Sequence, residues 1–349
     1  MYDVIIIGAG QAGLAVGYYL SQRNKSFIIL ERNASVGDSW VQRYDSLHLF
    51  TPRRYNSLPG FDFPGKLDGF PSKDEAALYL KAYTKEFNLP VRTSEHVLSI
   101  SRENGGFQVN LTSEQLFAHQ VVIATGPFQE PAIPQFASSL PEVVNQMHSS
   151  EYRNASQLHD GSVLVVGAGN SGAQIACELT ATHDVHLAAS KSISQLPLTL
   201  LGRSIFWYFD KAGLMKAHKS TAVGKWLRKK PEYVYGNELR NRIRENKIIV
   251  HPRAVRADGK RITFSDQRSI EVSNVIWATG FKRNDAWIRI PGAFDSDGQI
   301  RHTDGVSSVQ GLYYIGMQWQ TSRGSSLLGW VKIDAQKIAD KICEATEQA

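Results

Sequence analysis

Short apolar runs that lead into a glycine-rich turn give the chain its clearest pattern of hydrophobic and polar positions. The first run spans residues 4–7, precedes the turn at residues 8–13, and is followed by a helical pattern up to Leu20. A second apolar run covers residues 27–30. Unbroken runs of about four apolar residues are typical of parallel strands buried on both faces. The pattern therefore predicts a strand, a turn, a helix and a strand in that order.

The same order of elements returns near the middle of the chain. An apolar run at residues 163–166 precedes a second glycine-rich turn at residues 167–172, a helix over residues 173–180 and a strand at residues 185–189. A repeat of this kind predicts an α/β protein with two Rossmann-like dinucleotide-binding domains.

Each unit is closed by a further short apolar strand that ends in the same three residues. Ala124-Thr125-Gly126 closes the first unit, and Ala278-Thr279-Gly280 closes the second at a similar distance from its first glycine. Because open α/β sheets bind ligands at the carboxyl ends of their strands, these small residues are expected to lie beside the bound nucleotides.

The first glycine-rich turn has the spacing of a dinucleotide-binding turn. Gly8 suits the tight turn, Gly10 leaves room for a pyrophosphate beside the backbone, and Gly13 lets the helix pack closely on the strand. The N–H groups at the start of that helix attract the anion. Glu31 ends the second strand, where a carboxylate accepts hydrogen bonds from a ribose diol. This unit therefore suits a nucleotide with an unmodified ribose.

The second glycine-rich turn repeats this spacing with one change. Ser190 and Lys191 stand where the first unit has Glu31 and Arg32. A hydroxyl and a cation in place of a carboxylate favour a ribose 2′-phosphate. The second unit is therefore predicted to bind NADPH, with NADH as an alternative reductant.

Composition narrows the class of protein. The chain has 349 residues, of which 42% are hydrophobic and 21% charged, enough for two or three lobes with substantial cores. Its two cysteines, Cys177 and Cys343, form no CxxC arrangement, which argues against a disulfide scaffold, a zinc site and a redox-active dithiol. Neither a signal peptide nor an apolar run of membrane-spanning length is apparent. We therefore expect a cytoplasmic, globular protein with no metal site and no transmembrane segment.

The net charge of +6 is concentrated in one region. Residues 216–261 contain fourteen Lys or Arg against four Asp or Glu. A solvated helical face is the simplest interpretation, and attraction of an anionic cofactor or weak contact with acidic lipid head groups are the alternatives. Nucleic acid is not expected as a partner, because no nucleic-acid-binding motif accompanies the charge.

Several further stretches carry a resemblance to a known family. They are Gly37-Asp38-Ser39-Trp40, the tract at residues 44–52, His148-Ser149-Ser150-Glu151-Tyr152, and Trp277-Ala278-Thr279-Gly280-Phe281. Together with the two glycine-rich turns, they resemble the two-dinucleotide-binding-domain flavoproteins, and among them the flavin-containing monooxygenases and their bacterial relatives. The resemblance covers nearly the whole chain.

This resemblance implies a domain organisation and a set of cofactors. Residues 1–155 and 281–349 are expected to form a discontinuous FAD-binding domain, and residues 156–280 an inserted NAD(P)H-binding domain. Residues 200–245 are a candidate helical cap over the substrate entrance. The cofactors implied are FAD and NADPH, with O₂ as co-substrate.

The resemblance and the motifs together name the candidate site residues. For FAD these are Gly8, Gly10, Gln11, Ala12, Gly13, Glu31, Arg32, Ser39, Trp40, Leu47, His48, Val97, Ala124, Thr125, Gly126, Gln318 and Leu327. For NADPH they are Gly167, Gly169, Asn170, Ser171, Gly172, Ser190, Lys191, Ala278, Thr279 and Gly280. Phe50 is the candidate at the flavin face, and no general acid or base is assigned.

The chain also departs from the family pattern. Glu142 and Val144 stand where the FxGxxxHxxxY fingerprint has Phe and Gly, although the HxxxY half is present. Phe50 occupies the position of an asparagine that lies beside the flavin in the eukaryotic enzymes. Tyr152-Arg153 replaces the Trp-Pro pair of Baeyer–Villiger enzymes. These departures favour oxidase leakage and disfavour Baeyer–Villiger oxygenation.

The function predicted from the sequence is that of an FAD-dependent NADPH monooxygenase. By the resemblance, it forms a C4a-hydroperoxyflavin and oxygenates a soft nucleophile, a sulfide or an amine, on a small molecule. The alternatives are an NAD(P)H oxidase or flavin reductase without oxygen transfer, a Baeyer–Villiger-type enzyme, and a nucleotide-sensing partner protein. A homodimer is left open.

Overall fold

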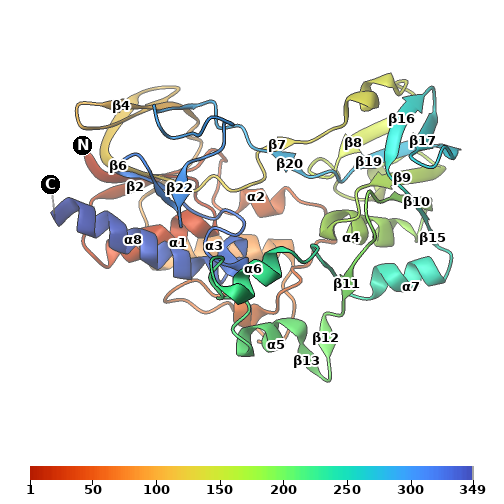
Figure 1. Ribbon diagram of the computed structural model, residues 1–349, viewed down its shortest axis with the longest axis horizontal. Helices are drawn as coiled ribbons and strands as arrows, with labels where there is room; N and C mark the ends of the chain where they lie inside the picture. Colours follow the sequence, from red (N-terminus) through yellow and green to blue (C-terminus); the bar gives the residue numbers. More distant parts are fainter. Residues whose placement is uncertain (348–349) are drawn as a thin grey trace.

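A computed structural model describes residues 1–347 and shows two lobes, each built on its own sheet (Figure 1). The first sheet has ten strands, with the order β21-β4-β5-β6-β1-β2-β3 and β24, β23 and β22 attached through β6. Their bounds are β1 Tyr2–Ile7, β2 Phe27–Leu30, β3 Val91–Arg92, β4 Val97–Glu103, β5 Gly106–Leu111, β6 Gln115–Ile123, β21 Ile288–Arg289, β22 His302–Thr303, β23 Val306–Ser307 and β24 Leu312–Tyr314.

The predicted strand at the start of the chain lies at the centre of this sheet. β1 pairs in parallel with β2 on one side and with β6 on the other, and β24 pairs in parallel with β6. The carboxyl ends of these strands therefore meet at one edge, where Gly8 and Ala124 follow β1 and β6. One face of the sheet packs on the helices α1 Gln11–Ser21, α3 Lys73–Glu86 and α8 Val331–Glu347.

The second sheet has five strands, all parallel, in the order β15-β10-β9-β19-β8. Its strands are β8 Asn145–His148, β9 Ser162–Val166, β10 Asp184–Ala188, β15 Ile248–His251 and β19 Asn274–Trp277. The helices α4 Asn170–Leu179 and α7 Glu238–Arg244 cover one face. The other face is covered by an antiparallel sheet of β16 Ala254–Asp258, β17 Arg261–Phe264 and β18 Ser269–Glu271. The predicted α/β class with two Rossmann-like sheets is confirmed.

Two segments cross between the lobes. The chain leaves the first lobe through β7 Glu130–Pro131 and returns through β20 Phe281–Lys282, and these two strands pair with each other (Figure 1). β8 already belongs to the second sheet, although residues 145–148 fall within the range 1–155 expected for the FAD-binding domain. The domain boundaries at residues 155 and 280 remain predictions. The boundary at residue 155 lies after β8, which is a strand of the second sheet.

The segment considered as a cap contains helices and short strands. Residues 200–245 hold β13 Arg203–Ser204, β14 Val234–Tyr235 and the helices α5 Ile205–Lys211, α6 Ala222–Arg228 and α7. β13 pairs with β12 Thr199–Leu200 and β14 pairs with β11 Gln195–Leu196, and both of these partner strands begin before residue 200. Phe206 and Met215 share a core cluster with Trp330 of the first lobe, whereas α7 packs against α4 of the second. The segment therefore connects the two lobes.

The structure gives no membrane-spanning candidate within residues 1–347. None of the helices found there combines the length and the apolar character that a bilayer crossing requires. The longest helix described in this range, α8, is amphipathic and packs its apolar side on the core of the first lobe.

A buried histidine pair in the second lobe makes its stability depend on pH. His186 Nδ1 lies 2.8 Å from His251 Nε2, and the His251 ring stacks on Phe264 at 4.2 Å. Burial, followed by the neighbouring His186 and Arg268, lowers the pKa of His251 to about 4, while Asp266 opposes the shift.

We expect this pair to destabilise the protein as the pH falls below 6.5. Because the folded pKa of His251 lies below the unfolded value, its contribution is complete above pH 6.5 and is lost as the pH falls toward 4. Between pH 7 and pH 5 the loss is about 2 kcal/mol. Urea unfolding at both pH values should show it, and a His251→Phe variant should show a smaller difference. An unchanged pH dependence in that variant would assign the effect to other groups.

Candidate nucleotide-binding and active site

The first glycine-rich turn has a backbone that admits only glycine at two positions. Gly8 adopts φ +108°, and a Cβ there would lie 2.6 Å from the carbonyl oxygen of Ala124. A Cβ on Gly13 would lie 1.9 Å from the carbonyl oxygen of Gly8. Gly10 is different, because a Cβ there would meet no protein atom within 4 Å. Gly8 and Gly13 are therefore required by the fold, and Gly10 leaves an open space in front of the turn.

The second turn has almost the same geometry. Gly167 adopts φ +110° and lies against the carbonyl of Ala278, and a Cβ on Gly172 would again lie 1.9 Å from the carbonyl oxygen of the first glycine. A Cβ on Gly169 would meet nothing within 4 Å. The backbone carbonyls of Ala124 and Ala278 therefore explain why the first position of each turn is glycine, and the Ala278 side chain also faces Gly172, whose Cβ would lie 3.1 Å away.

Both turns lead into a helix whose N-terminus has no side-chain cap. Gly10 is the N-cap of α1 and Gly169 that of α4, and neither helix has an acidic residue in its first turn. The N–H groups of the first turn, with the positive end of the helix dipole, therefore remain available to an anion. Open space in front of both turns fits the pyrophosphate of a dinucleotide.

The carboxylate of Glu31 lies beside the first turn. It accepts hydrogen bonds from the backbone N–H of Ala9 and of Asn33, each at 2.9 Å. These bonds fix the carboxylate at the end of β2 and leave lone pairs free for a ribose diol. Arg32 is exposed, and Val97 starts β4 close by, where Glu95 donates its N–H to the carbonyl of Glu31.

The corresponding position of the second unit is open to solvent. Ser190 and Lys191 follow β10 and are both exposed. Within residues 1–347, Lys191 has no ion pair with a carboxylate. A free cation beyond the second strand matches the position of a 2′-phosphate.

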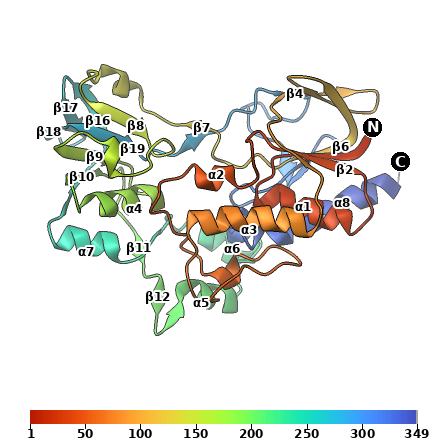
Figure 2. The ribbon, with the colours of Figure 1, turned by 180° about the vertical axis from the view of Figure 1, so that it is seen from behind.

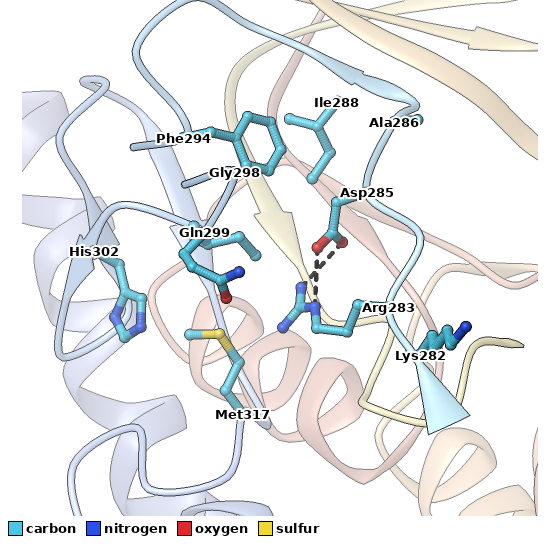
Figure 3. A pocket seen from close by; sticks show the side chains of 11 residues that line it. Lys282, Arg283, Asp285, Ala286, Ile288, Phe294, Gly298, Gln299, His302 and Met317 are labelled. Carbon is cyan, nitrogen blue, oxygen red and sulfur yellow. Dashed lines mark hydrogen bonds and ion pairs between the residues drawn. The ribbon is translucent and has the colours of Figure 1, made fainter. Parts of the chain in front are cut away.

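A cavity of about 700 Å³ lies between residues 282–302 and Met317, which follows β24 (Figure 3). Met317 lines it, and the preceding Gly316 is close enough to the first turn that a Cβ would lie 3.0 Å from the Cβ of Ala12. Arg283 and Asp285 lie on the same wall and form an ion pair, with 3.0 Å between Arg283 Nε and Asp285 Oδ2. Sequence reasoning missed this cavity, whose walls come mostly from residues 282–302 between short strands.

Hydrogen bonds hold α4 against the tract at residues 44–48 of the first lobe. The Tyr44 hydroxyl donates to the side-chain oxygen of Gln174 at 2.8 Å, and the Gln174 amide donates to the carbonyl of His48 at 3.3 Å. Ser46 and Tyr152 both bond to Glu178. Burial raises the pKa of Tyr44, so it remains a neutral donor. The second turn is thereby fixed beside the first lobe.

Phe50 lies where the lobes and the inserted segment meet. Its ring stacks on Tyr235 at 4.7 Å and on Phe206 at 5.8 Å. Tyr235 donates its backbone N–H to the side-chain oxygen of Asn170, whose amide donates to the carbonyl of Tyr233. The predicted Phe50 and Asn170 therefore belong to one contact network through β14.

The segment after β24 completes this region. Gln318 donates to Glu232, and Leu327 packs with Phe50 in the aromatic cluster. Arg323 donates to the Tyr235 hydroxyl at 2.8 Å, and Trp319 adopts a left-handed φ of +56°. Sequence reasoning named neither Arg323 nor Trp319. A tryptophan whose backbone adopts the left-handed conformation is strained, and strain of this kind is common at functional sites.

The remaining predicted residues lie around the two turns without further chemistry of their own. Trp40 packs against the core between the first sheet and its helices, and Leu47 packs against the cores of both lobes. Ser39 and His48 are largely exposed. Thr125 accepts from Gln129, and Thr279 donates to the carbonyl of Ala132. Gln11, Ala12, Gly126, Ser171 and Gly280 lie at the same two edges.

Neither cysteine forms a redox pair. Cys177 is buried in α4 and Cys343 lies in α8, and both are free thiols. Burial raises the pKa of Cys177 to about 12, so its reactive thiolate is suppressed. Across the described residues 1–347, no three His, Cys, Asp or Glu side chains come together as a metal site.

His148 has a structural environment rather than a catalytic one. It is fully buried, its Nε2 lies 2.9 Å from the carbonyl of Gly280, and its Nδ1 lies 2.8 Å from Ser150 Oγ. Burial lowers its pKa, which keeps the ring neutral. These bonds tie β8 to the start of β20, at the crossing between the lobes.

Comparisons with known proteins identify the family of the chain. Residues 5–251, which contain both turns, match the family model described as pyridine nucleotide-disulphide oxidoreductase. The uncharacterized oxidoreductase CzcO of Bacillus subtilis is 47% identical over 342 residues, 98% of this chain and 99% of the relative. The probable indole-3-pyruvate monooxygenase YUCCA1 of Arabidopsis thaliana is 30% identical over 380 residues, 98% of this chain and 90% of the relative.

A solved structure shares the fold over the full length. The flavin-containing monooxygenase from Stenotrophomonas maltophilia superposes with a TM-score of 0.83 at 24% identity, and the match covers 99% of both chains. The two glycine-rich turns, a mixed sheet and a parallel sheet that carry them, and these matches support the same assignment, and the predicted class of enzyme is confirmed. The chain belongs to the pyridine nucleotide-disulphide oxidoreductase family and is a flavin-monooxygenase-like NAD(P)H-dependent flavoprotein oxidoreductase.

Proposed function

We propose that the protein is an FAD-dependent monooxygenase that uses NADPH and O₂ to oxygenate a soft nucleophile, a sulfide or an amine, on a small molecule. The observation that supports this most directly is the pair of uncapped, open glycine-rich turns whose lobes are fixed together by α4 and the tract at residues 44–48. One turn then holds the flavin, and the other holds the nucleotide that reduces it.

The residues of the first lobe fit FAD. Its pyrophosphate would lie before Gly10 at the start of α1, and Glu31 would hold the adenosine ribose. The bound flavin supplies the redox and oxygen chemistry. The protein binds and orients it, and the aromatic cluster of Phe50, Phe206 and Tyr235 excludes water from the region where the lobes meet.

The residues of the second lobe fit NADPH. The open space before Gly169 suits its pyrophosphate, and the exposed Lys191 is free to pair with its 2′-phosphate. Asn170 is hydrogen-bonded to Tyr233 and Tyr235. The proposed nucleotide site is therefore joined directly to the aromatic cluster.

A Lys191→Ala variant is expected to discriminate less well between NADPH and NADH. Loss of one charge-assisted contact at an exposed position should raise the KM for NADPH about tenfold and leave that for NADH unchanged. Steady-state kinetics with both nucleotides measures this directly, with Lys81→Ala, an exposed lysine on α3 of the first lobe, as the control. An unchanged ratio of the two KM values would refute the role of Lys191.

The cysteines favour oxygen over a disulfide as the final electron acceptor. Cys177 and Cys343 lie on helices of different lobes, so electrons have no dithiol to pass through. Two free cysteines also accord with the reducing cytoplasm as the site of action. An oxidase without oxygen transfer is the second candidate, because Phe50 offers no hydrogen-bond donor at the flavin face.

The test is the coupling of NADPH oxidation to product. Purified protein loaded with FAD would be given NADPH, air and a methyl aryl sulfide or a tertiary amine, with peroxide and oxygenated product measured together. The proposal predicts product formation at the expense of peroxide. Peroxide equal to the NADPH consumed, with every substrate offered, would support the oxidase.

A further inference from the structure

A hairpin of the inserted segment projects from the body of the protein. The strands β12 and β13 pair as an antiparallel hairpin with a two-residue loop, Leu201-Gly202, and the hairpin extends beyond both lobes in two opposite views (Figures 1 and 2). Both loop residues have positive φ, +47° and +73°. Two-residue loops of this conformation strongly favour Asn-Gly or Asp-Gly.

Leucine is an unfavourable residue at this position. A branched side chain in the left-handed region is strained, and four of the nine non-glycine residues with positive φ among residues 1–347 are asparagines. The Leu201 side chain also gains nothing from burial, because 88% of it is exposed, and the adjacent Leu200 is 45% exposed. The folded monomer has no evident use for an apolar side chain at this tip.

The surrounding chain is strongly cationic. Residues 199–230 contain eight Lys or Arg and one acidic residue, Asp210. Lys216 pairs with Asp210 and Lys219 with Asp304. The other six cations have no carboxylate partner within the described part of the chain; they are Arg203, Lys211, Lys225, Arg228, Lys229 and Lys230.

The helix α6 presents a second apolar group among these charges. Gly224 and Leu227 face inward, whereas Val223 and Trp226 are 45% and 53% exposed. Lys230 places its Nζ 4.5 Å from the centre of the Trp226 ring, and Arg203 lies over Trp207 at 5.4 Å. Tryptophan beside lysine and arginine is the combination found where proteins meet the interface of a bilayer.

We propose that the exposed apolar and cationic groups of this segment, at the hairpin tip and on α6, dock the enzyme on an anionic phospholipid membrane. Leu201 and Trp226 enter the head-group region, and the six unpaired cations attract the anionic lipid. A protein partner is disfavoured, because the centres of protein interfaces are depleted in lysine, whereas here lysines surround single apolar side chains. The proposal is independent of the reaction that the site performs.

The test uses the FAD-loaded full chain and sedimentation with vesicles. The wild type should bind vesicles of phosphatidylcholine with phosphatidylglycerol, bind weakly to phosphatidylcholine alone, and dissociate as salt rises. Leu201→Asn should weaken binding about tenfold, because the apolar insertion is lost, without lowering the thermal unfolding midpoint, because asparagine suits the turn. Leu78→Asn, at a 65% exposed leucine on α3, is the matched control and should bind as the wild type does.

The charges are tested separately. Lys225→Glu combined with Lys229→Glu should weaken binding to the anionic vesicles at least about tenfold. The proposal would be overturned by absence of binding to anionic vesicles, by equal binding to both kinds of vesicle, by unchanged binding of the Leu201 or the double lysine variant, or by equal losses in the two asparagine variants. Lipid-independent capture by an acidic protein would assign the surface to a protein partner instead.

Discussion

A Gly169→Val variant is expected to fold, to retain FAD, and to lose its affinity for NADPH. Gly169 has an extended backbone, φ −77° and ψ −176°, which valine adopts readily, and no protein atom lies within 4 Å of the new Cβ. The side chain would occupy the space in front of α4 where the proposed pyrophosphate lies. Loss of about two charge-assisted hydrogen bonds should raise the Kd for NADPH about 100-fold or more.

The measurement is reduction of the bound flavin by NADPH without oxygen. The variant should be yellow and have a normal unfolding midpoint, but it should be reduced only at high NADPH. A Gly172→Ala variant is the contrast, because its Cβ would lie 1.9 Å from the carbonyl oxygen of Gly167 and should destabilise the second lobe itself. Normal reduction of the Gly169 variant at low NADPH would place the nucleotide elsewhere.

The reciprocal change, Gly10→Val, is expected to give a folded protein without FAD. Gly10 is extended as well, φ −75° and ψ −179°, and a Cβ there meets no protein atom within 4 Å. The proposed flavin pyrophosphate would be displaced from α1, with a loss of affinity of about 100-fold or more. The purified protein should be colourless, and titration with FAD should show weak binding.

Binding of NADPH separates this result from general misfolding. The second turn is intact in the Gly10 variant, so the colourless protein should still bind NADPH, as calorimetry can show. A yellow Gly10 variant would mean that the first turn does not hold the flavin. Failure to bind both nucleotides, together with a lowered unfolding midpoint, would mean that valine disturbs the fold.

The repeated glycines could be predicted from the sequence because their constraint is local. Gly8 and Gly13, like Gly167 and Gly172, are limited by backbone atoms of their own unit. The sequence also placed Ala124 and Ala278 at the same edges, and the structure adds that the backbone carbonyl of each lies against the first glycine of its turn.

Contacts between distant and irregular segments could not be predicted in this way. β14 has two residues, and Tyr235 in it lies 65 residues after Asn170, so no periodicity in the sequence predicts their hydrogen bond. β8, with the sequence Asn-Gln-Met-His, lacks an apolar run and is recognisable as a strand only through its pairing with β19. The cavity beside Met317 depends on short strands for the same reason.

Anaerobic titration of the FAD-loaded wild type with NADPH measures how many electron pairs each chain accepts. If the first turn holds FAD, the second holds NADPH, and Cys177 and Cys343 form no dithiol, the protein can accept one electron pair per chain. We therefore expect complete bleaching of the flavin at one equivalent of NADPH. A requirement for two equivalents would reveal a second redox centre. Absence of bleaching would contradict the assignment of FAD to the first turn and NADPH to the second.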